Sequence, residues 1–133
     1  MTLPKTIFLT LAVAGFTGCQ AQLPNEQQAV ENVSAVEFKE KLTHGTGVLV
    51  DVRTPDEFAK GHIESARLMD FYSDDFKDQV LTLDSADTVF VYCRSGNRSS
   101  QAVEIMRASG ITQIVHLAGG INSWNKAGLP LAK

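Results

Sequence analysis

The chain has 133 residues, which suits one domain of ordinary size with a buried core. Hydrophobic residues make up 44% of it and charged residues 20%, proportions that are typical of a globular chain and exclude a disordered one. The net charge of −3 and the dispersed lysines and arginines give no reason to expect a nucleic-acid partner.

The first segment, 1–18, has the pattern of an export signal. Lys5 precedes an uncharged apolar run over 7–16, which is too short to span a bilayer and is typical of a secretory signal peptide. The run leads into Phe16-Thr17-Gly18-Cys19, which resembles the lipobox of bacterial lipoproteins, where the cysteine is diacylated and becomes the new N-terminus. We therefore expect a lipid anchor on Cys19, since two acyl chains hold a protein stably at a membrane. An ordinary signal peptide with an incidental cysteine is the alternative.

Polar residues fill 19–32 and predict a lipidated tether ahead of a domain over 33–133. Gln20 follows Cys19, which resembles sorting to the outer membrane in a host with two membranes, so we expect the domain on its periplasmic face. The one other cysteine is Cys93, which is then left without a disulfide partner. A disulfide between the two cysteines is the competing account, and lipidation of Cys19 would exclude it.

The domain begins with a helix and a strand. A capping-box signature at Ser34 and Glu37 predicts a short helix that stops near Gly45 or Gly47. Its candidate core residues are Val36, Phe38 and Leu42. Residues 48–52 are apolar with almost no alternation, which is typical of a strand buried on both faces of a parallel sheet.

A second capping box at Thr54 and Glu57, with Pro55 at the first helical position, predicts a brief helix that ends at Gly61. A loop then leads into a short strand near residue 69. Ser73 is the expected cap of the next helix. The apolar stripe of that helix consists of Phe76, Val80, Leu81 and Leu83.

The remaining predicted elements are two strands, over 88–92 and 113–117, and two helices, over 99–109 and 121–127. Trp124 is expected to pack inward from the last helix. This alternation of strands and helices predicts an α/β sandwich with a mostly parallel sheet covered on both faces. Ligands of such sheets bind beyond the carboxyl ends of the strands, and Cys93 follows a strand directly.

The loop that carries Cys93 reads Cys93-Arg94-Ser95-Gly96-Asn97-Arg98-Ser99 and leads into a helix. A helix N-terminus has unpaired N–H groups and a partial positive charge, which favour anions and lower the pKa of a nearby thiol. The pattern therefore predicts a reactive thiolate at Cys93 in an anion-binding loop. A buried, inert cysteine beside two solvated arginines is the alternative.

Four segments, over 51–58, 61–66, 91–99 and 117–124, together resemble the rhodanese family in their order and spacing. The resemblance extends over roughly 33–131 and implies a small single-domain sulfurtransferase. It also implies a three-layer α/β/α sandwich with a five-stranded parallel sheet in the order 3-2-4-5-1, whose first strand would lie near 31–33. One departure is visible, because Glu64-Ser65 stands where the family usually has Pro-Gly.

The resemblance implies a two-step reaction at Cys93. The thiolate takes the outer sulfur of a small anionic donor such as thiosulfate, and the resulting persulfide passes it to an acceptor such as cyanide or a thiol. Cofactors and metals are not expected, since His44, His62 and His116 share no metal-ligand spacing. The predicted anion-binding groups are those of Arg94, Ser95, Gly96, Asn97, Arg98 and Ser99.

Roles within the predicted site differ in how far the sequence defines them. Arg94 is expected to hold the donor, whereas Arg98 is left open between anion binding and a structural bridge to a carboxylate. Asp51 and Arg53 are expected to brace the loop, and His62 to be structural.

Two other functions compete with sulfur transfer by turnover. Some phosphatases also use a loop with a cysteine and an arginine. The phosphatase pattern has five residues between the cysteine and the arginine, whereas four residues separate Cys93 from Arg98. The shorter loop favours a persulfide over a phosphoryl group. The other alternative is a persulfide carrier or binding module that hands sulfur to a protein partner, with little turnover of free thiosulfate. The oligomeric state is left open.

Overall fold

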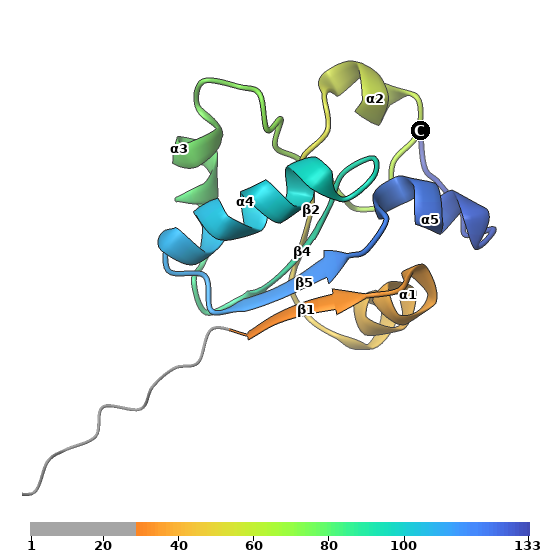
Figure 1. Ribbon diagram of the computed structural model, residues 1–133, viewed down its shortest axis with the longest axis horizontal. Helices are drawn as coiled ribbons and strands as arrows, with labels where there is room; N and C mark the ends of the chain where they lie inside the picture. Colours follow the sequence, from red (N-terminus) through yellow and green to blue (C-terminus); the bar gives the residue numbers. More distant parts are fainter. Residues whose placement is uncertain (1–28) are drawn as a thin grey trace, which may run out of the picture.

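A computed structural model describes residues 29–133, which fold around one five-stranded sheet (Figure 1). All four neighbouring strand pairs are parallel, and the strand order is β1-β5-β4-β2-β3. The expected order of the sheet is thereby confirmed. The strands are β1 (Ala29–Val33), β2 (Val48–Asp51), β3 (Arg67–Leu68), β4 (Thr88–Tyr92) and β5 (Gln113–Leu117). The helices are α1 (Ala35–His44), α2 (Pro55–Ala59), α3 (Phe76–Val80), α4 (Asn97–Ala108) and α5 (Gly120–Lys126).

Helices cover both faces of the sheet and make three layers, as the pattern predicted. Helices α3 and α4 lie on one face, α1 and α5 on the other, and α2 lies at the rim (Figure 1). Because side chains alternate along a strand, β5 supplies both cores. Ile114 packs under α4 and α3, whereas Val115 and Leu117 pack with Phe38 of α1 and Trp124 of α5.

Local signals account for the starts of the first two helices. The Ser34 hydroxyl accepts the Glu37 backbone N–H at 3.3 Å, and Thr54 and Glu57 cap α2 reciprocally. The strands β2 and β4 are buried along nearly their whole length, which agrees with the apolar runs over 48–50 and 89–91.

Several boundaries and burial predictions are corrected. Strand β1 begins at Ala29, so residues 29–32, predicted as the end of the tether, belong to the folded domain. Ser73 does not cap α3, whose N-cap residue is Asp75 without a side-chain capping bond. Val36 and Leu81 are exposed by 59% and 67% rather than buried, because each helix presents only one face to the sheet.

The departure at Glu64-Ser65 has a conformational consequence. The Ala66 N–H donates to the Ile63 carbonyl at 3.0 Å and closes a turn, in which Ser65 adopts a φ of 68°. A left-handed residue with a Cβ is strained by about 1 kcal/mol or more, which glycine avoids. The chain therefore keeps the turn at an energetic cost.

Within 29–133, no helix is long and apolar enough to cross a membrane. The predicted signal peptide, the lipid-bearing Cys19 and the tether up to residue 28 lie outside the described residues.

Candidate active site

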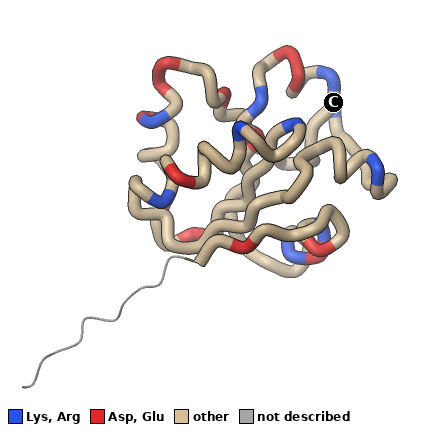
Figure 2. Tube along the Cα trace, viewed as in Figure 1, with Lys and Arg blue, Asp and Glu red and all other residues tan. Residues whose placement is uncertain are grey.

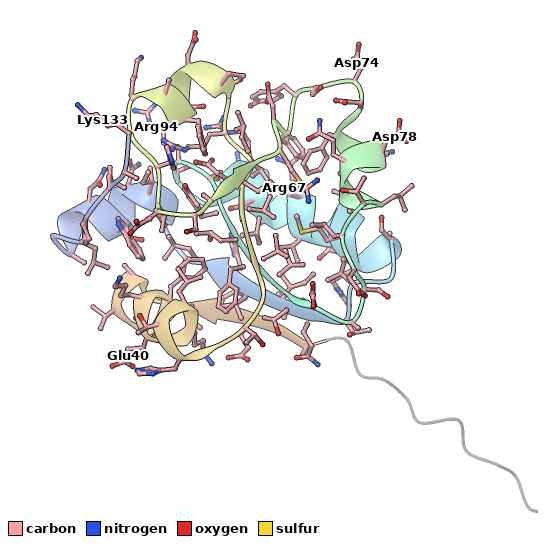
Figure 3. All side chains as sticks on the ribbon, turned by 180° about the vertical axis from the view of Figure 1, so that it is seen from behind. Glu40, Arg67, Asp74, Asp78, Arg94 and Lys133 are labelled. Atoms are coloured by element: carbon pink, nitrogen blue, oxygen red, sulfur yellow. The ribbon has the colours of Figure 1, made fainter. Side chains whose placement is uncertain are left out.

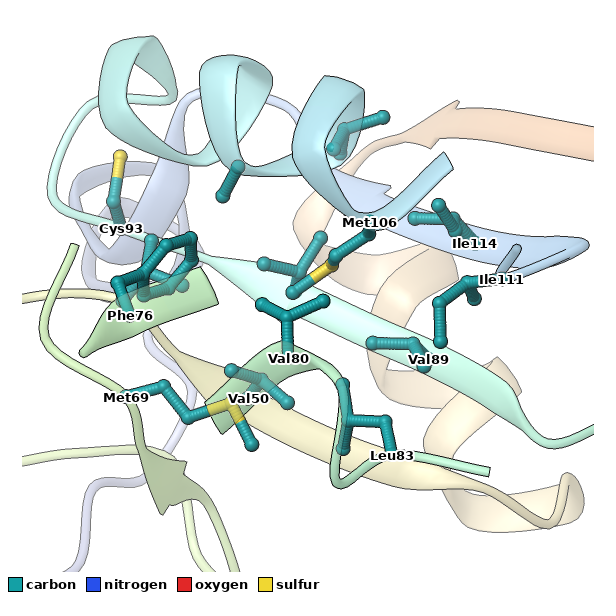
Figure 4. Close-up of a cluster of buried hydrophobic side chains, with 14 residues drawn as sticks. Val50, Met69, Phe76, Val80, Leu83, Val89, Cys93, Met106, Ile111 and Ile114 are labelled. Carbon is teal, nitrogen blue, oxygen red and sulfur yellow. The ribbon is translucent and has the colours of Figure 1, made fainter. Parts of the chain in front are cut away.

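Cys93 lies directly after β4, at the carboxyl edge of the sheet where the sequence placed it. Its thiol is free and fully buried against the core under α3 and α4. Figure 4 shows the sulfur atom pointing toward the beginning of α4. Helix α4 begins at Asn97, two residues earlier than predicted, so the connecting loop is only Cys93–Gly96. The short loop brings the first turn of the helix close to the sulfur.

The loop donates hydrogen bonds to the sulfur. The Gly96 backbone N–H lies 3.1 Å from Sγ, and the Ser99 hydroxyl lies 3.3 Å from it. Gly96 reaches this position with a φ of 102°, which a residue with a Cβ rarely adopts. Burial by itself raises the pKa of Cys93, but hydrogen bonds from Ser99, Gly96 and Ser95 outweigh it, so the net pKa lies below the ordinary value.

Helix α5 supports the loop from behind. The Ile121 N–H donates to the Cys93 carbonyl at 2.9 Å, and the Asn122 N–H donates to the Arg94 carbonyl at 3.1 Å. Gly120 precedes them with a φ of 59°, and a Cβ there would lie 2.5 Å from both carbonyl oxygens. The turn at Gly119-Gly120 is thus a close backbone approach that positions Cys93.

Arg98 is held by a contact with another element, which bears on its two open roles. Its guanidinium donates to both carboxylate oxygens of Glu57 on α2, at 2.7 and 2.8 Å, and lies 5.6 Å from the centre of the Tyr72 ring. Glu57 also completes the cap at Thr54. The Arg98 guanidinium lowers the pKa of Glu57 to about 2. The structural bridge is therefore the role that the geometry supports.

Arg94, in contrast, is exposed, and no side-chain partner for it is present within residues 29–133. It lines a cavity of about 350 Å³ together with Lys60 of the α2 end and Asn122 of α5. Figure 3 labels Arg94 near the chain end at Lys133, and in Figure 2 several Lys and Arg positions lie around the chain end, beside a stretch of Asp and Glu. Ser95 and Asn97 are also exposed, whereas Ser99 is buried. Within the described part of the chain, the loop thus has one arginine side chain without a side-chain partner, at the edge of a cavity.

Asp51 and Arg53 form a buried ion pair beside the site. Arg53 Nη2 donates to Asp51 Oδ2 at 2.7 Å and to the Gly61 carbonyl at 2.7 Å, and Tyr92 Oη accepts the Ile63 N–H at 3.0 Å. Among the described residues, neither Asp51 nor Arg53 has a side-chain hydrogen bond to residues 93–99, so the expected bracing acts on the neighbouring segment at Gly61 instead.

The histidines divide into two kinds. His62 is structural as expected, because its ring stacks on Phe58 at 3.7 Å and Nδ1 lies 3.1 Å from the Phe58 carbonyl oxygen. His116 is a site residue that the sequence reasoning missed, since its Nε2 lies 2.6 Å from Ser99 Oγ. The available signal was a lone histidine in the apolar strand 113–117, because a buried polar side chain requires a partner.

Comparison with known proteins agrees with this geometry. The family model for the rhodanese-like domain matches residues 34–127. A sulfurtransferase of Allochromatium vinosum is 33% identical over 77% of this chain and 94% of its own length. The thiosulfate sulfurtransferase 16 of Arabidopsis thaliana is 31% identical over 81% of this chain and 98% of its own.

Two further similarities extend the comparison. An uncharacterized protein of Synechocystis is 38% identical over 65% of this chain, and the match spans about half of that longer protein (47%). The crystal structure of a rhodanese-related protein from Thermoplasma volcanium superposes with a TM-score of 0.68 at 28% identity, covering 77% of this chain and 97% of that one. The chain therefore belongs to the family of rhodanese-like domains, whose members include sulfurtransferases.

Proposed function

We propose that this protein is a sulfurtransferase that works through a persulfide on Cys93. The thiolate attacks the outer sulfur of a donor such as thiosulfate, a bond forms between Sγ and that sulfur, and sulfite leaves with the bonding electron pair. An acceptor nucleophile, a thiol or cyanide, then takes the outer sulfur and restores the thiolate. The observation that carries the proposal is the pair of donors, from Gly96 and Ser99, on the Cys93 sulfur.

The charges around the loop support a small anionic donor. The unpaired Arg94 and the nearby Lys60 attract an anion to the cavity, and the N–H groups at the start of α4 favour negative charge on sulfur in both the thiolate and the persulfide. The burial of Cys93 favours a compact donor over a bulky one.

The engagement of Arg98 argues against phosphoryl transfer. A phosphatase loop needs its arginine on the phosphoryl oxygens, and here the guanidinium has both of its terminal nitrogens on Glu57. Release of phosphate from an aryl phosphate, abolished in Cys93→Ser, would overturn this preference.

The direct test combines mass and turnover. Thiosulfate should add about 32 Da, one sulfur atom, to the purified full-length protein, and cyanide should then remove it as thiocyanate. Cys93→Ser should lose both the adduct and the turnover, whereas Cys19→Ala should keep both. An adduct with negligible turnover would favour the alternative persulfide carrier, and no adduct with no turnover would refute both sulfur hypotheses.

We further propose that Cys19 carries a lipid that anchors the domain at the periplasmic side of the outer membrane. The support is the sequence pattern over 7–20 and the start of the folded domain at Ala29, which leaves a polar segment between anchor and domain. Membrane fractionation tests it: the wild-type chain should sediment with membranes, and Cys19→Ala should not. Sedimentation of Cys19→Ala with the membranes would refute the lipid anchor.

A further inference from the structure

A row of hydrogen-bonded side chains leads from the buried Cys93 sulfur across the sheet to Asn32, which is exposed on the edge strand β1. Ser99 Oγ lies 3.3 Å from Cys93 Sγ and 2.6 Å from His116 Nε2, and His116 Nδ1 lies 2.7 Å from Asn32 Oδ1. The four residues come from the end of β4 and from α4, β5 and β1. The sulfur-transfer mechanism described above does not use His116 or Asn32.

The backbone builds this row. His116 pairs in register with Asn32 of β1 and with Val91 of β4, so their side chains stand on the same sheet face. Helix α4 covers that face and places Ser99 over His116. Ser99 is fully buried and His116 is 6% exposed. A histidine occupies a position beside Ile114 that the apolar core could have filled.

Proton counting gives the row two complementary states. With Nδ1–H donating to Asn32 Oδ1, neutral His116 has a free lone pair on Nε2, and the single Ser99 hydroxyl proton points to it. Ser99 Oγ is then open to accept the Cys93 S–H. In the other state His116 is an imidazolium that donates to Ser99, and the Ser99 hydroxyl donates to the thiolate. The Gly96 carbonyl, 3.2 Å from Ser99 Oγ, is a more distant acceptor than His116.

We propose that His116 is a positioning residue that takes the Cys93 thiol proton through Ser99, with Asn32 holding the imidazole in the required tautomer. The sulfur proton moves to Ser99 Oγ while the Ser99 proton moves to His116 Nε2, so the thiol and neutral imidazole become thiolate and imidazolium. No heavy-atom bond changes, and the reverse transfer restores the thiol. This inference deepens the proposed function, because a role of His116 in turnover rests on sulfur transfer at Cys93.

The surroundings leave Cys93 as the titratable group coupled to His116. Strand β4 presents Val91 to it, β1 presents Asn32, and α4 presents Ser99. The charged residues on these elements face elsewhere. Glu31 of β1 binds Lys41 at 2.8 Å, Arg98 of α4 binds Glu57, and Glu104 and Arg107 of α4 pair with each other at the solvent-exposed surface. Burial lowers the pKa of His116, so the imidazole is neutral at neutral pH before the transfer, and the thiolate formed beside it offsets the cost of the buried imidazolium.

The test measures the pH dependence of Cys93 alkylation by iodoacetamide in the full-length Cys19→Ala background. His116→Gln retains an amide that can donate to Ser99 but cannot take up a proton. We expect its alkylation midpoint to rise by about one pH unit and its rate below that midpoint to fall about tenfold, with an unchanged rate at alkaline pH. Ser99→Ala should give a similar or larger rise, since it also removes a donor to sulfur.

Two controls make the result decisive. His62→Gln replaces a histidine outside the row and should leave the midpoint unchanged. Adding His116→Gln to Ser99→Ala should shift the midpoint no further, because the path between His116 and sulfur is already broken. An unshifted midpoint in His116→Gln, or additive shifts in the double variant, would overturn the proposal.

The readout also separates this inference from the proposed function. Alkylation requires no sulfur donor, so a protein without sulfur-transfer activity would still report the His116 effect. In an active protein the acidic limb of the pH–rate profile for thiocyanate formation should move in the same direction as the alkylation midpoint. If His116→Gln fails to fold, Asn32→Ala leaves Ser99 on the sulfur but removes the partner of His116 Nδ1, and it should still raise the midpoint relative to His62→Gln. An unshifted midpoint in Asn32→Ala would then overturn the proposal.

Discussion

The two arginines of the Cys93 loop stand in opposite surroundings although they are four positions apart. Arg98 forms an ion pair with Glu57 and lies against the Tyr72 ring. Together with Ser99 and the backbone contact at Gly120, it makes up the part of the loop that is fixed by other elements, here called the held side. Arg94 belongs to the open side, with an exposed guanidinium at a cavity. The held side shapes the loop, and the open side is where we propose that the ligand binds. Charge alone therefore does not assign a role to an arginine.

The largest effect is expected from breaking the held side at Gly120. Gly120→Ala places a methyl group 2.5 Å from the Cys93 and Arg94 carbonyl oxygens at a left-handed φ, and should destabilise the protein by about 3 kcal/mol and reduce sulfur transfer. Urea unfolding measures the loss. The matched control is Gly128→Ala, which has a similar φ but nothing within 4 Å and should cost only about 1 kcal/mol. Equal losses would show that the close approach is unimportant.

The second prediction concerns the ion pair that holds Arg98. Glu57→Gln should lower the free energy of unfolding by about 2 kcal/mol at neutral pH, since it removes a charge-assisted, bidentate contact that is largely shielded from water. Because the folded pKa of Glu57 is depressed from 4.5 to about 2, the wild-type advantage is complete above pH 4.5 and disappears as the pH falls toward 2.

Urea titrations at several pH values check this dependence. Glu104→Gln is the matched control, because the Glu104–Arg107 pair is long (3.4 Å) and solvent-exposed and should contribute less than about 0.5 kcal/mol. If the difference in free energy of unfolding between the wild type and Glu57→Gln stays constant from neutral pH to pH 2, the stabilisation does not come from the ionised Glu57 carboxylate.

The third prediction tests the open side. Arg94→Ala should raise the KM for thiosulfate about tenfold, equivalent to about 1.4 kcal/mol, and leave kcat and stability nearly unchanged, since the side chain attracts the donor but does not support the fold. Arg107→Ala, at the far end of α4, should change neither constant. A fall in kcat with an unchanged KM would move Arg94 from donor binding to the chemical step.

The smallest effect is expected at a turn outside both sides of the loop. Ser65→Gly should stabilise the protein by about 0.5–1 kcal/mol, because glycine relieves the left-handed strain but loses more backbone entropy on folding. Thermal unfolding should show a slightly higher Tm with unchanged sulfur transfer. A lower Tm would mean that Ser65 contributes contacts that outweigh its strain.

Much of the fold could be predicted from local sequence patterns, whereas the hydrogen bonds and ion pairs of the site could not. The caps at Ser34 and Thr54 and the apolar strand 113–117 are signals within a few residues, and the family resemblance supplied the strand order. The partners of Arg98 and His116 lie 41 and 84 residues away in sequence. Such contacts depend on the register of the strands and on how α4 and α2 pack at the edge of the sheet, and no short sequence pattern encodes either. Hence Cys93 was found directly, and Glu57, Asn32 and the role of His116 were not.

The pairing of β1 with β5 has a consequence for the order in which the domain folds. The two strands come from opposite ends of the domain sequence, so their pairing must close a long stretch of chain. Parallel, non-local pairing of this kind is slow to form. Asn32 and Ser99 have no His116 to bond until β5 takes its place in the sheet, and α5 can support the Cys93 carbonyl only after that. A partly folded chain should therefore carry an ordinary thiol, with activation of the cysteine among the final events of folding.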